Sequence, residues 1–182
     1  MAFETFAVHA ACIRGVEAIP VTVEVSLAGG VPGIQMLGIP SMEVMESRGR
    51  IRCAMRSAGF EIPRSGITVN LAPGDIRKTG SGFDLPIAIA CWQPMGRFPA
   101  TTSIAALSLV SWLDGTVLPV KGEVAFQLLA RDMGLSFIAG RSTSMCHCGR
   151  GLRIYRSSVS ACSWYGRCRA ARLGFRGRRG DL

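Results

Sequence analysis

The sequence predicts a domain of the α/β (α+β) class, with a mixed sheet of four or five strands and two or three helices packed on it. Segments with the two-residue hydrophobic period of half-buried strands alternate with segments whose apolar residues recur every three to four positions. Glycine and proline separate many of these segments. The 182 residues are enough to bury one ordinary hydrophobic core.

Three strands are expected before the first helix. Residues 5–13 alternate loosely between apolar and polar side chains, and residues 20–27 alternate clearly. The second segment has an apolar face and a solvated face, made respectively of Val21, Val23, Val25 and Leu27 and of Thr22, Glu24 and Ser26. A glycine-rich turn at 29–33 leads to a third strand at 34–39. The first two strands are expected to pair as a hairpin or meander.

A helix is expected to follow Ser41. Ser41 is a preferred N-cap residue, and Glu43 places negative charge in the first turn. Glu46 and Arg50 have the spacing of a pair on the exposed side, and Gly59 suits the C′ position after the helix. The apolar stripe consists of Val44, Ile51, Met55 and Ala58. A solvated amphipathic face is favoured over a phosphate-binding face for the helix's four arginines, Arg48, Arg50, Arg52 and Arg56.

The stretch around which the chain is organised runs from a strand into a buried helix. Residues 67–71 alternate as a strand does, and the turn at 73–75 ends that strand. The polar, glycine-containing loop at 77–82 is interpreted as a flexible connection. Asp84 suits the N-cap of the next helix, and Pro86 falls in its first turn, where the missing N–H costs nothing.

The helical pattern of this stretch breaks at Pro94, and regular patterns return only later. A short strand is expected at 117–120, and a helix at 124–133. Gly134 occupies the C′ position of that helix. A final strand is expected at 135–138.

The net charge of +9 is concentrated at one end of the chain. Residues 1–140 hold 11 Lys and Arg against 11 Asp and Glu, whereas residues 141–182 hold ten Arg and one Asp. This tail has no lasting period, no lysine and four of the seven cysteines, a composition typical of GC-rich coding DNA read out of register. We therefore expect residues 91–112 and 141–182 to be frame-shifted, with the frame restored between them.

Four quoted segments resemble one known domain. They are "VTVEVSLAGGVPGIQMLGIP", "ESRGRIRCAMRSAGFEIP", "TVNLAPGDIRKTGSGFDLPIAIA" and "LDGTVLPVKGEVAFQLLARDMGL". The chain resembles, over 5–90 and 113–139, the N-terminal (ChlI-like, Lon-protease-like) domain of magnesium-chelatase-like AAA+ ATPases of the ComM or YifB type. The family-motif positions, interpreted as structural, are Asn70, Pro73, Asp75, Asp84 and Pro86. The expected division is a domain at 1–140 and an Arg/Cys-rich tail, disordered or aberrant, at 141–182.

The resemblance carries expectations about fold and function. It implies a Lon-like, ribosomal-protein-type β-α domain containing a left-handed crossover. Full-length relatives of the ComM type are implicated in ATP-dependent branch migration of DNA, recombination and natural transformation. This chain is then a truncated, non-catalytic N-terminal domain whose partner is the AAA+ ATPase module or hexameric ring of intact relatives.

Neither of the two catalytic activities associated with such folds is expected here. Alignment with the proteolytic domain of Lon places Asp84 at the position of the catalytic serine and the lysine position near Val124, while Lys121 and Ser81 lie several residues from the dyad positions. An aspartate cannot act as an acyl-forming serine. The phosphate-binding motif G-x-x-x-x-G-K-[ST] is absent, so no cofactor is expected in this chain, and ATP and Mg²⁺ are expected only for the full-length family protein.

A metal site is also not expected. The tail's Cys146-His147-Cys148 cluster, with Cys162 and Cys168, lacks the regular pairs of zinc sites, and His9 is interpreted as structural. The seven cysteines are expected to be free thiols.

The remaining alternative is a free-standing nucleic-acid-binding protein that uses its tail. Ten arginines with interleaved aromatic residues could contact phosphates and stack on bases, the aromatic residues being Tyr155, Trp164, Tyr165 and Phe175. Because no apolar run approaches the ~20 residues of a membrane span and no secretion signal is visible, a cytoplasmic protein without membrane contact is expected.

Overall fold

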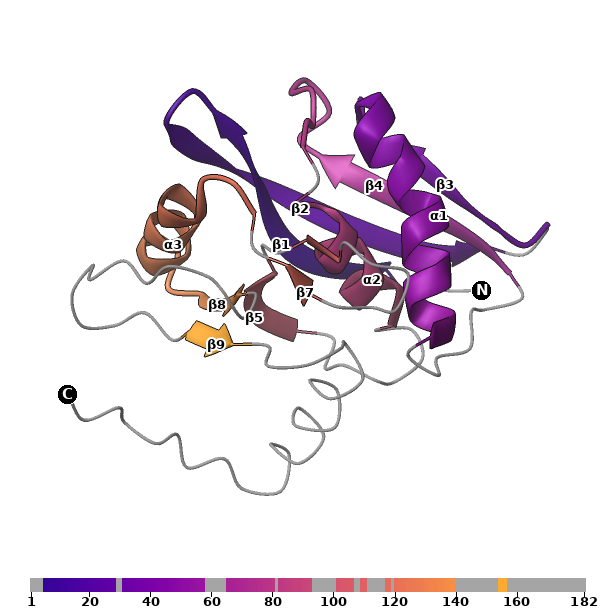
Figure 1. Ribbon diagram of the computed structural model, residues 1–182. Coiled ribbons are helices and arrows are strands. Elements are labelled where there is room, and N and C mark those ends of the chain that lie inside the picture. The colour runs from indigo at the N-terminus through magenta and orange to yellow at the C-terminus, as the bar shows by residue number, and fades with distance from the viewer. Residues whose placement is uncertain are drawn as a thin grey trace.

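The computed structural model describes residues 5–28, 31–57, 65–80, 82–92, 101–106, 109–110, 117–118, 120–139 and 154–156 (Figure 1). Three helices and nine strands lie in these ranges. The helices are α1 (Met42–Ser57), α2 (Asp84–Trp92) and α3 (Glu123–Asp132). The strands are β1 (Thr5–Arg14), β2 (Glu17–Ala28), β3 (Gly33–Leu37), β4 (Gly66–Ala72), β5 (Thr101–Ala106), β6 (Leu109–Val110), β7 (Val117–Leu118), β8 (Ser136–Ala139) and β9 (Ile154–Arg156).

Seven of these strands form one mixed sheet, in the order β3-β4-β2-β1-β5-β8-β9. The pairs β1–β2 and β2–β4 are antiparallel, whereas β3–β4, β1–β5, β5–β8 and β8–β9 are parallel. The α/β class and the mixed sheet are therefore confirmed. The expected first four strands form the β3-β4-β2-β1 part of the sheet, and β5, β8 and β9 extend it.

The register of the first four strands separates an apolar face from a polar one. Val23 of β2 lies opposite Val8 of β1 and Leu71 of β4, and all three side chains are buried. On the opposite face, the Asn70 side-chain amide donates a 2.9 Å hydrogen bond to the carboxylate of Glu24. The two-residue period predicted this division because successive side chains of a strand point to opposite faces.

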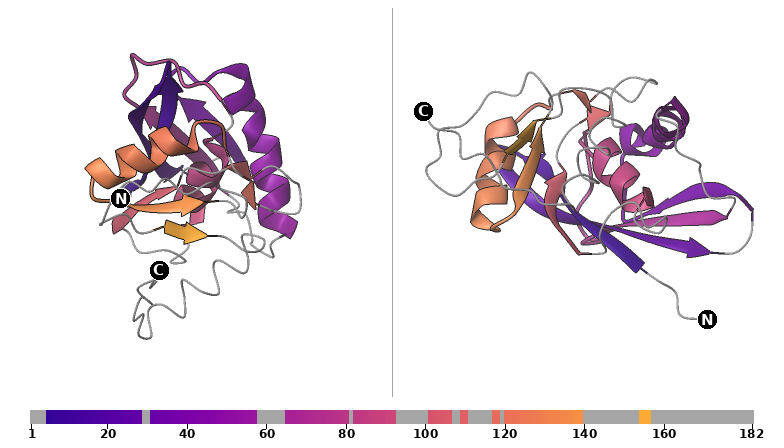
Figure 2. Two further views of the ribbon diagram at one scale, coloured as in Figure 1. Left: turned by 60° about the vertical axis from the view of Figure 1, so that its left-hand side comes forward. Right: turned by 90° about the horizontal axis from the view of Figure 1, so that it is seen from below.

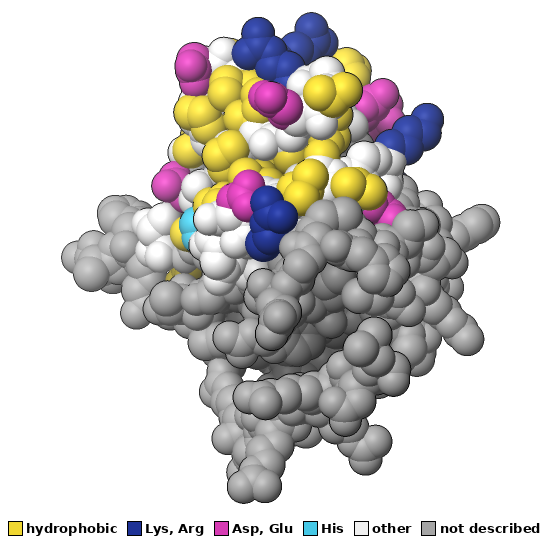
Figure 3. All heavy atoms as spheres, turned by 90° about the vertical axis from the view of Figure 1, so that its left-hand side faces the viewer, with side chains coloured by type: hydrophobic (Ala, Val, Ile, Leu, Met, Phe, Trp, Pro, Cys, Tyr) yellow, Lys and Arg dark blue, Asp and Glu magenta, His cyan; other side chains and the backbone are white. Residues whose placement is uncertain are grey.

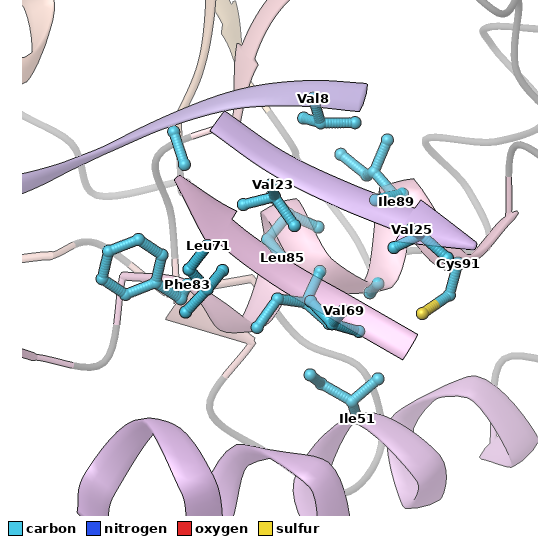
Figure 4. Packing of buried hydrophobic residues seen from close by; sticks show 14 of the residues in the cluster. Val8, Val23, Val25, Ile51, Val69, Leu71, Phe83, Leu85, Ile89 and Cys91 are labelled. Atoms are coloured by element: carbon cyan, nitrogen blue, oxygen red, sulfur yellow. The ribbon is translucent and has the colours of Figure 1, made fainter. Parts of the chain in front are cut away.

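Helices α1 and α2 cover the apolar face of this part of the sheet (Figure 2, right). Ile51 of α1 and Leu85 and Ile89 of α2 point toward Val69 and Val25 of the strands (Figure 4). Every residue of α2 is buried, so this short helix fills the centre of the core. The predicted apolar stripe of α1 is confirmed at three positions, Val44, Ile51 and Met55.

The connection between β3 and α1 passes very close to β4. Gly38 has a φ of 92°, and a Cβ built on it would lie 2.2 Å from the Leu71 carbonyl oxygen. The next residue, Ile39, also has a positive φ, 52°, which is uncommon for a β-branched side chain. Ser41 then begins α1 as predicted, because its Oγ accepts a 3.4 Å hydrogen bond from the Val44 N–H.

The strand, the helix and the final strand that were expected after residue 116 are also present. The expected strand and helix correspond to β7 and α3, and the expected final strand to β8. Gly134, with a φ of 66°, ends α3 as predicted: its N–H donates to the Arg131 carbonyl, and the Leu135 N–H donates to that of Ala130. These two bonds form a Schellman motif.

Three elements were not predicted. Strands β5 and β6 lie within residues 91–112, and β9 lies within the tail. Strand β5 pairs with β1 and β8, so it joins the two halves of the sheet. The predictions for Ala58 and Gly59 lie outside the described residues.

The close approach at Gly38 leads to a stability prediction. Gly38→Ala should lower the free energy of unfolding by at least ~2 kcal/mol, because the added Cβ meets backbone and the positive φ disfavours alanine. Urea denaturation followed by circular dichroism measures the change.

Gly49→Ala is the matched control. Gly49 lies in α1, and a Cβ added there would have nothing within 4 Å, so alanine should stabilise the helix by about 1 kcal/mol. Equal effects of the two substitutions would contradict the close backbone contact at Gly38.

Candidate functional site

An ion pair between a partly exposed arginine and a buried aspartate joins the two core helices. The Arg50 Nε of α1 donates a 2.8 Å hydrogen bond to Asp84 Oδ2, and its Nη2 donates a 3.1 Å bond to Oδ1. Asp84 is the first residue of α2 and is only 1% exposed. The two parallel bonds give the bidentate geometry that suits a planar guanidinium and a carboxylate.

Burial has the largest effect on the pKa of Asp84, whereas the hydrogen bond between the two residues has the largest effect on the pKa of Arg50. Burial raises the pKa of Asp84 above its usual value, although Arg50 opposes that shift. The pKa of Arg50 is raised, chiefly by its hydrogen bond to Asp84. Arg50 is thus held in its charged form, while Asp84 loses more by leaving water than it gains from its partner.

Two sequence predictions are corrected here. Asp84 is not an N-cap: the Ile87 N–H donates to the Phe83 carbonyl, so Phe83 precedes the helix and Asp84 lies in its first turn. Arg50 does not form its ion pair with Glu46, because the guanidinium turns to the buried carboxylate of Asp84. A desolvated carboxylate needs a charged partner more than an exposed glutamate does.

Lys78 contradicts the interpretation of 77–82 as a flexible connection. Its side chain is fully buried, and its Nζ donates a hydrogen bond to the Pro73 carbonyl. Its backbone N–H donates to the Ile39 carbonyl at 3.2 Å, and its own carbonyl accepts from the Ser41 N–H at 2.9 Å. Burial lowers the pKa of Lys78. The loop is therefore tied to the start of α1 through Lys78.

A cleft of about 880 Å³ with both polar and apolar lining residues lies between the start of α1, the loop at 79–82 and the segment at 120–126. The Gly80 N–H donates a 3.2 Å hydrogen bond to Glu43 Oε2, which joins the first two of these walls. The cleft also contains the end of β1, including the buried Cys12. Its charged lining residues are Glu43, Glu46, Arg50 and Lys121. Both signs of charge are present, so the cleft does not favour a purely anionic or cationic ligand.

The five family-motif positions lie in different environments. Pro73 follows β4, and its carbonyl oxygen holds Lys78. Asp75 lies exposed in the following turn, and Pro86 is buried in the first turn of α2, where it was predicted. Asn70 is farther away and bonds Glu24 on the other face of the sheet. Asp84 alone of the five pairs with a charge from another helix.

The positions considered for a peptidase dyad do not form one in the described part of the chain. The carboxylate of Asp84, the residue expected at the position of the Lon serine, is bound to Arg50. Lys121 is exposed on the rim of the cleft, and Val124 is exposed on α3. Ser81 lies outside the described residues.

Sequence reasoning missed the two residues that organise the site, Lys78 and the Arg50 guanidinium. Lys78 is one of only two lysines, but a lysine in a polar loop is normally solvated. Arg50 was placed on a solvated face because the helical pattern does not reveal that another helix packs beside it. Neither position carries a local signal of its tertiary contact.

The remaining candidate chemistry concerns the cysteines and His9. Cys12, Cys53 and Cys91 are free thiols, as predicted, and burial raises the pKa of Cys91 to about 12. His9 lies in β1 opposite Thr22. Within the described ranges, no group of three or more His, Cys, Asp or Glu could hold a metal ion. The tail cysteines and His147 lie outside those ranges.

None of the described helices is both long and apolar enough to cross a membrane.

The fold and the matched region define the class of protein. The family described as "Subunit ChlI of Mg-chelatase" matches residues 23–140, which is more than half of the chain. The chain belongs to this family. More particularly, it contains the ChlI-like N-terminal domain of magnesium-chelatase-like proteins of the YifB and ComM type.

Three curated relatives illustrate the similarity. "Uncharacterized protein YifB" of Salmonella typhimurium is 47% identical over 133 residues, which are 72% of this chain and 26% of the relative. The Escherichia coli protein of the same name is 49% identical over 83 residues, 46% of this chain and 16% of the relative. "Competence protein ComM" of Haemophilus influenzae is 37% identical over 131 residues, 69% of this chain and 26% of the relative. The chain thus spans about a quarter or less of each relative's length.

The ion pair between Arg50 and Asp84 leads to a prediction about how stability depends on pH. Arg50→Met should cost about 3–5 kcal/mol at neutral pH, because it leaves the Asp84 carboxylate buried without a partner. The loss of Arg50 raises the pKa of Asp84 further, and a raised folded-state pKa means that stability falls as pH rises. The penalty should therefore be smaller near pH ~4 than near pH ~7, as measured by urea denaturation at both values.

Arg50→Met combined with Asp84→Asn serves as the control. This double variant removes the unpaired charge, so its stability should vary less with pH than that of Arg50→Met alone. The same pH dependence in both variants would show that Asp84 is not the titrating group.

Proposed function

We propose that this chain acts as the non-catalytic N-terminal domain of a magnesium-chelatase-like AAA+ protein of the ComM or YifB type. The observation that carries the proposal is the state of Asp84, which stands at the nucleophile position of the Lon-like domain. Its carboxylate is buried and engaged by two hydrogen bonds from Arg50. The residue at this position therefore links two helices and is not presented to a substrate.

The proposal extends to cofactors and partners. The chain itself uses no cofactor, since its sequence lacks the phosphate-binding motif, and ATP with Mg²⁺ belongs to the longer relatives. Its partner is the AAA+ ATPase module or hexameric ring of an intact relative. The curated relatives are about four times as long as the region that they share with this chain, which leaves ample length for such a module. The site of action is the cytoplasm.

A domain exchange tests this proposal. Residues 1–140, with residues 91–112 in the corrected reading frame where sequencing finds one, replace the corresponding region of the Haemophilus influenzae competence protein ComM, which matches this chain at 37% identity. We expect the chimera to restore natural transformation to a strain lacking that protein. The purified 182-residue chain should hydrolyse neither ATP nor a casein substrate above the rate of a buffer blank.

The chimera carrying Arg50→Met is the control, because the substitution disrupts the helix pairing without touching the ATPase part. It should accumulate less and transform less. Normal transformation by a ComM protein lacking the whole N-terminal region would show that the domain has no role. Peptide cleavage by the purified chain would overturn the non-catalytic assignment.

We also propose that residues 91–112 and 141–182 are out of frame. The proposal rests on composition and pattern: the helical pattern breaks at Pro94, and residues 141–182 hold ten arginines and no lysine. Sequencing of the coding DNA decides the matter: another frame should restore a leucine-rich helix after Ala90 and a phosphate-binding loop downstream. If no frame restores these features, both segments are genuine.

The alternative function is nucleic-acid binding through the tail. All of the excess positive charge lies in 141–182, whereas acidic and basic side chains are interspersed over the β1–β2 hairpin and α3 (Figure 3). Affinity for single-stranded DNA should then fall steeply with salt and disappear when residues 141–182 are deleted. Fluorescence anisotropy at several salt concentrations measures both effects. Unchanged affinity of the shortened chain would contradict this alternative.

A further inference from the structure

Large apolar side chains are exposed at both ends of one edge strand. Strand β3 forms the edge of the sheet beside α1 (Figure 1). Val31, just before β3, is 88% exposed. Leu37 and Ile39, at and just after its end, are 45% and 54% exposed, and Met42 follows at 74%. An edge strand offers unpaired backbone groups, so this edge combines hydrogen-bonding capacity with apolar surface.

The exposure of Ile39 is imposed by its surroundings. Its positive φ of 52° is unfavourable for a β-branched residue, yet the backbone is held there on both sides. Gly38 lies against the Leu71 carbonyl, and the Ile39 carbonyl accepts the hydrogen bond from the buried Lys78. The fold therefore holds an apolar side chain toward solvent in a fixed, strained conformation, which is a reason to look for a partner surface.

We propose that this edge binds a second copy of the chain, with the two β3 strands antiparallel about a two-fold axis at Gln35. In this register Gly33 of each copy lies opposite Leu37 of the other, so the smallest residue faces a large one. Two residues farther from the axis, Val31 of each copy lies beside Ile39 of the other. The same contact forms twice, as a two-fold interface requires.

The surface at the start of β3 has the shape to accept this contact. A shallow groove of about 410 Å³ lies there, lined by Val31, Pro32 and Gly33 together with Arg48 and residues of β4. We call the exposed apolar side chains at the other end of β3, Leu37 and Ile39, the ridge. Antiparallel pairing brings the ridge of each copy to the groove of the other, so the edge is self-complementary.

Arg48 determines how the association responds to salt. Its guanidinium donates a long hydrogen bond, 3.5 Å, to the Ile34 carbonyl, whose second lone pair can still accept from another chain. Ile34 is next to the proposed axis, so the two copies bring their Arg48 side chains close together. Salt screens this repulsion, and the dimer should therefore become tighter as salt rises from about 0.05 M to about 0.5 M.

Sedimentation velocity on the full chain, treated with nuclease, tests the proposal. The wild-type chain should show a concentration-dependent monomer–dimer equilibrium. Val31→Lys and Ile39→Asp should each weaken the dimer by at least ~10-fold, because each places two charges in an apolar contact. Within one chain the two positions lie beyond opposite ends of β3, whose five residues span about 13 Å, so the new charges cannot pair internally.

The double variant Val31→Lys with Ile39→Asp distinguishes the register. In the proposed dimer the introduced lysine of each copy would meet the introduced aspartate of the other, so the dimer should be stronger than with either single substitution. Val16→Asp is the matched control, since Val16 is an equally exposed valine in the β1–β2 turn. All four variants should melt close to the wild-type temperature, because the altered side chains are exposed.

Several results would overturn the proposal. They are a monomer at every attainable concentration, equal weakening by Val16→Asp, or no recovery in the double variant. Association that nuclease removes would show bridging by nucleic acid bound to the arginine-rich tail. Dimerisation that weakens with salt would also exclude this interface, because the Arg48 side chains must then be apart.

Discussion

Complete burial of α2 is the constraint on which the rest of the structure depends. This nine-residue helix packs on the sheet beside α1, and all of its side chains are buried. Its first residue is an aspartate, and a buried carboxylate is tolerated only with a charged, hydrogen-bonded partner. Arg50 meets that need from α1, so the requirement of one helix determines how the other is oriented. The ion pair thereby fixes one point of contact between the two helices.

A second set of contacts extends this arrangement to the sheet edge. Lys78 binds Pro73 at the end of β4 and, through its backbone, the residues on either side of Pro40. The same contacts position the loop that lines one side of the cleft, and they fix the strained conformation of Ile39. The contacts of Lys78 thus connect the cleft with the exposed edge of β3. A change at Lys78 would affect both surfaces, although neither includes its side chain.

Family membership says which domain this chain contains, but not what the domain does. Membership of the ChlI family establishes the domain, and the chain covers about a quarter of the length of these relatives. What the domain can contribute must come from its surfaces and its stability. The ion pair, the cleft and the β3 edge are the parts of the described structure through which it could act.

The sequence by itself determined the fold class, the first four strands, the three helices and two of the residues that end them, Ser41 and Gly134. Periodicity, the Ser41 cap and Gly134 are local signals, and local physics was enough to interpret them. Only the tertiary structure decided the partner of Asp84 and the burial of Lys78, because both depend on segments distant in sequence. Strand β5 was missed for a related reason: the run Thr-Thr-Ser-Ile-Ala-Ala does not alternate, and pairing with β1 and β8 specifies it.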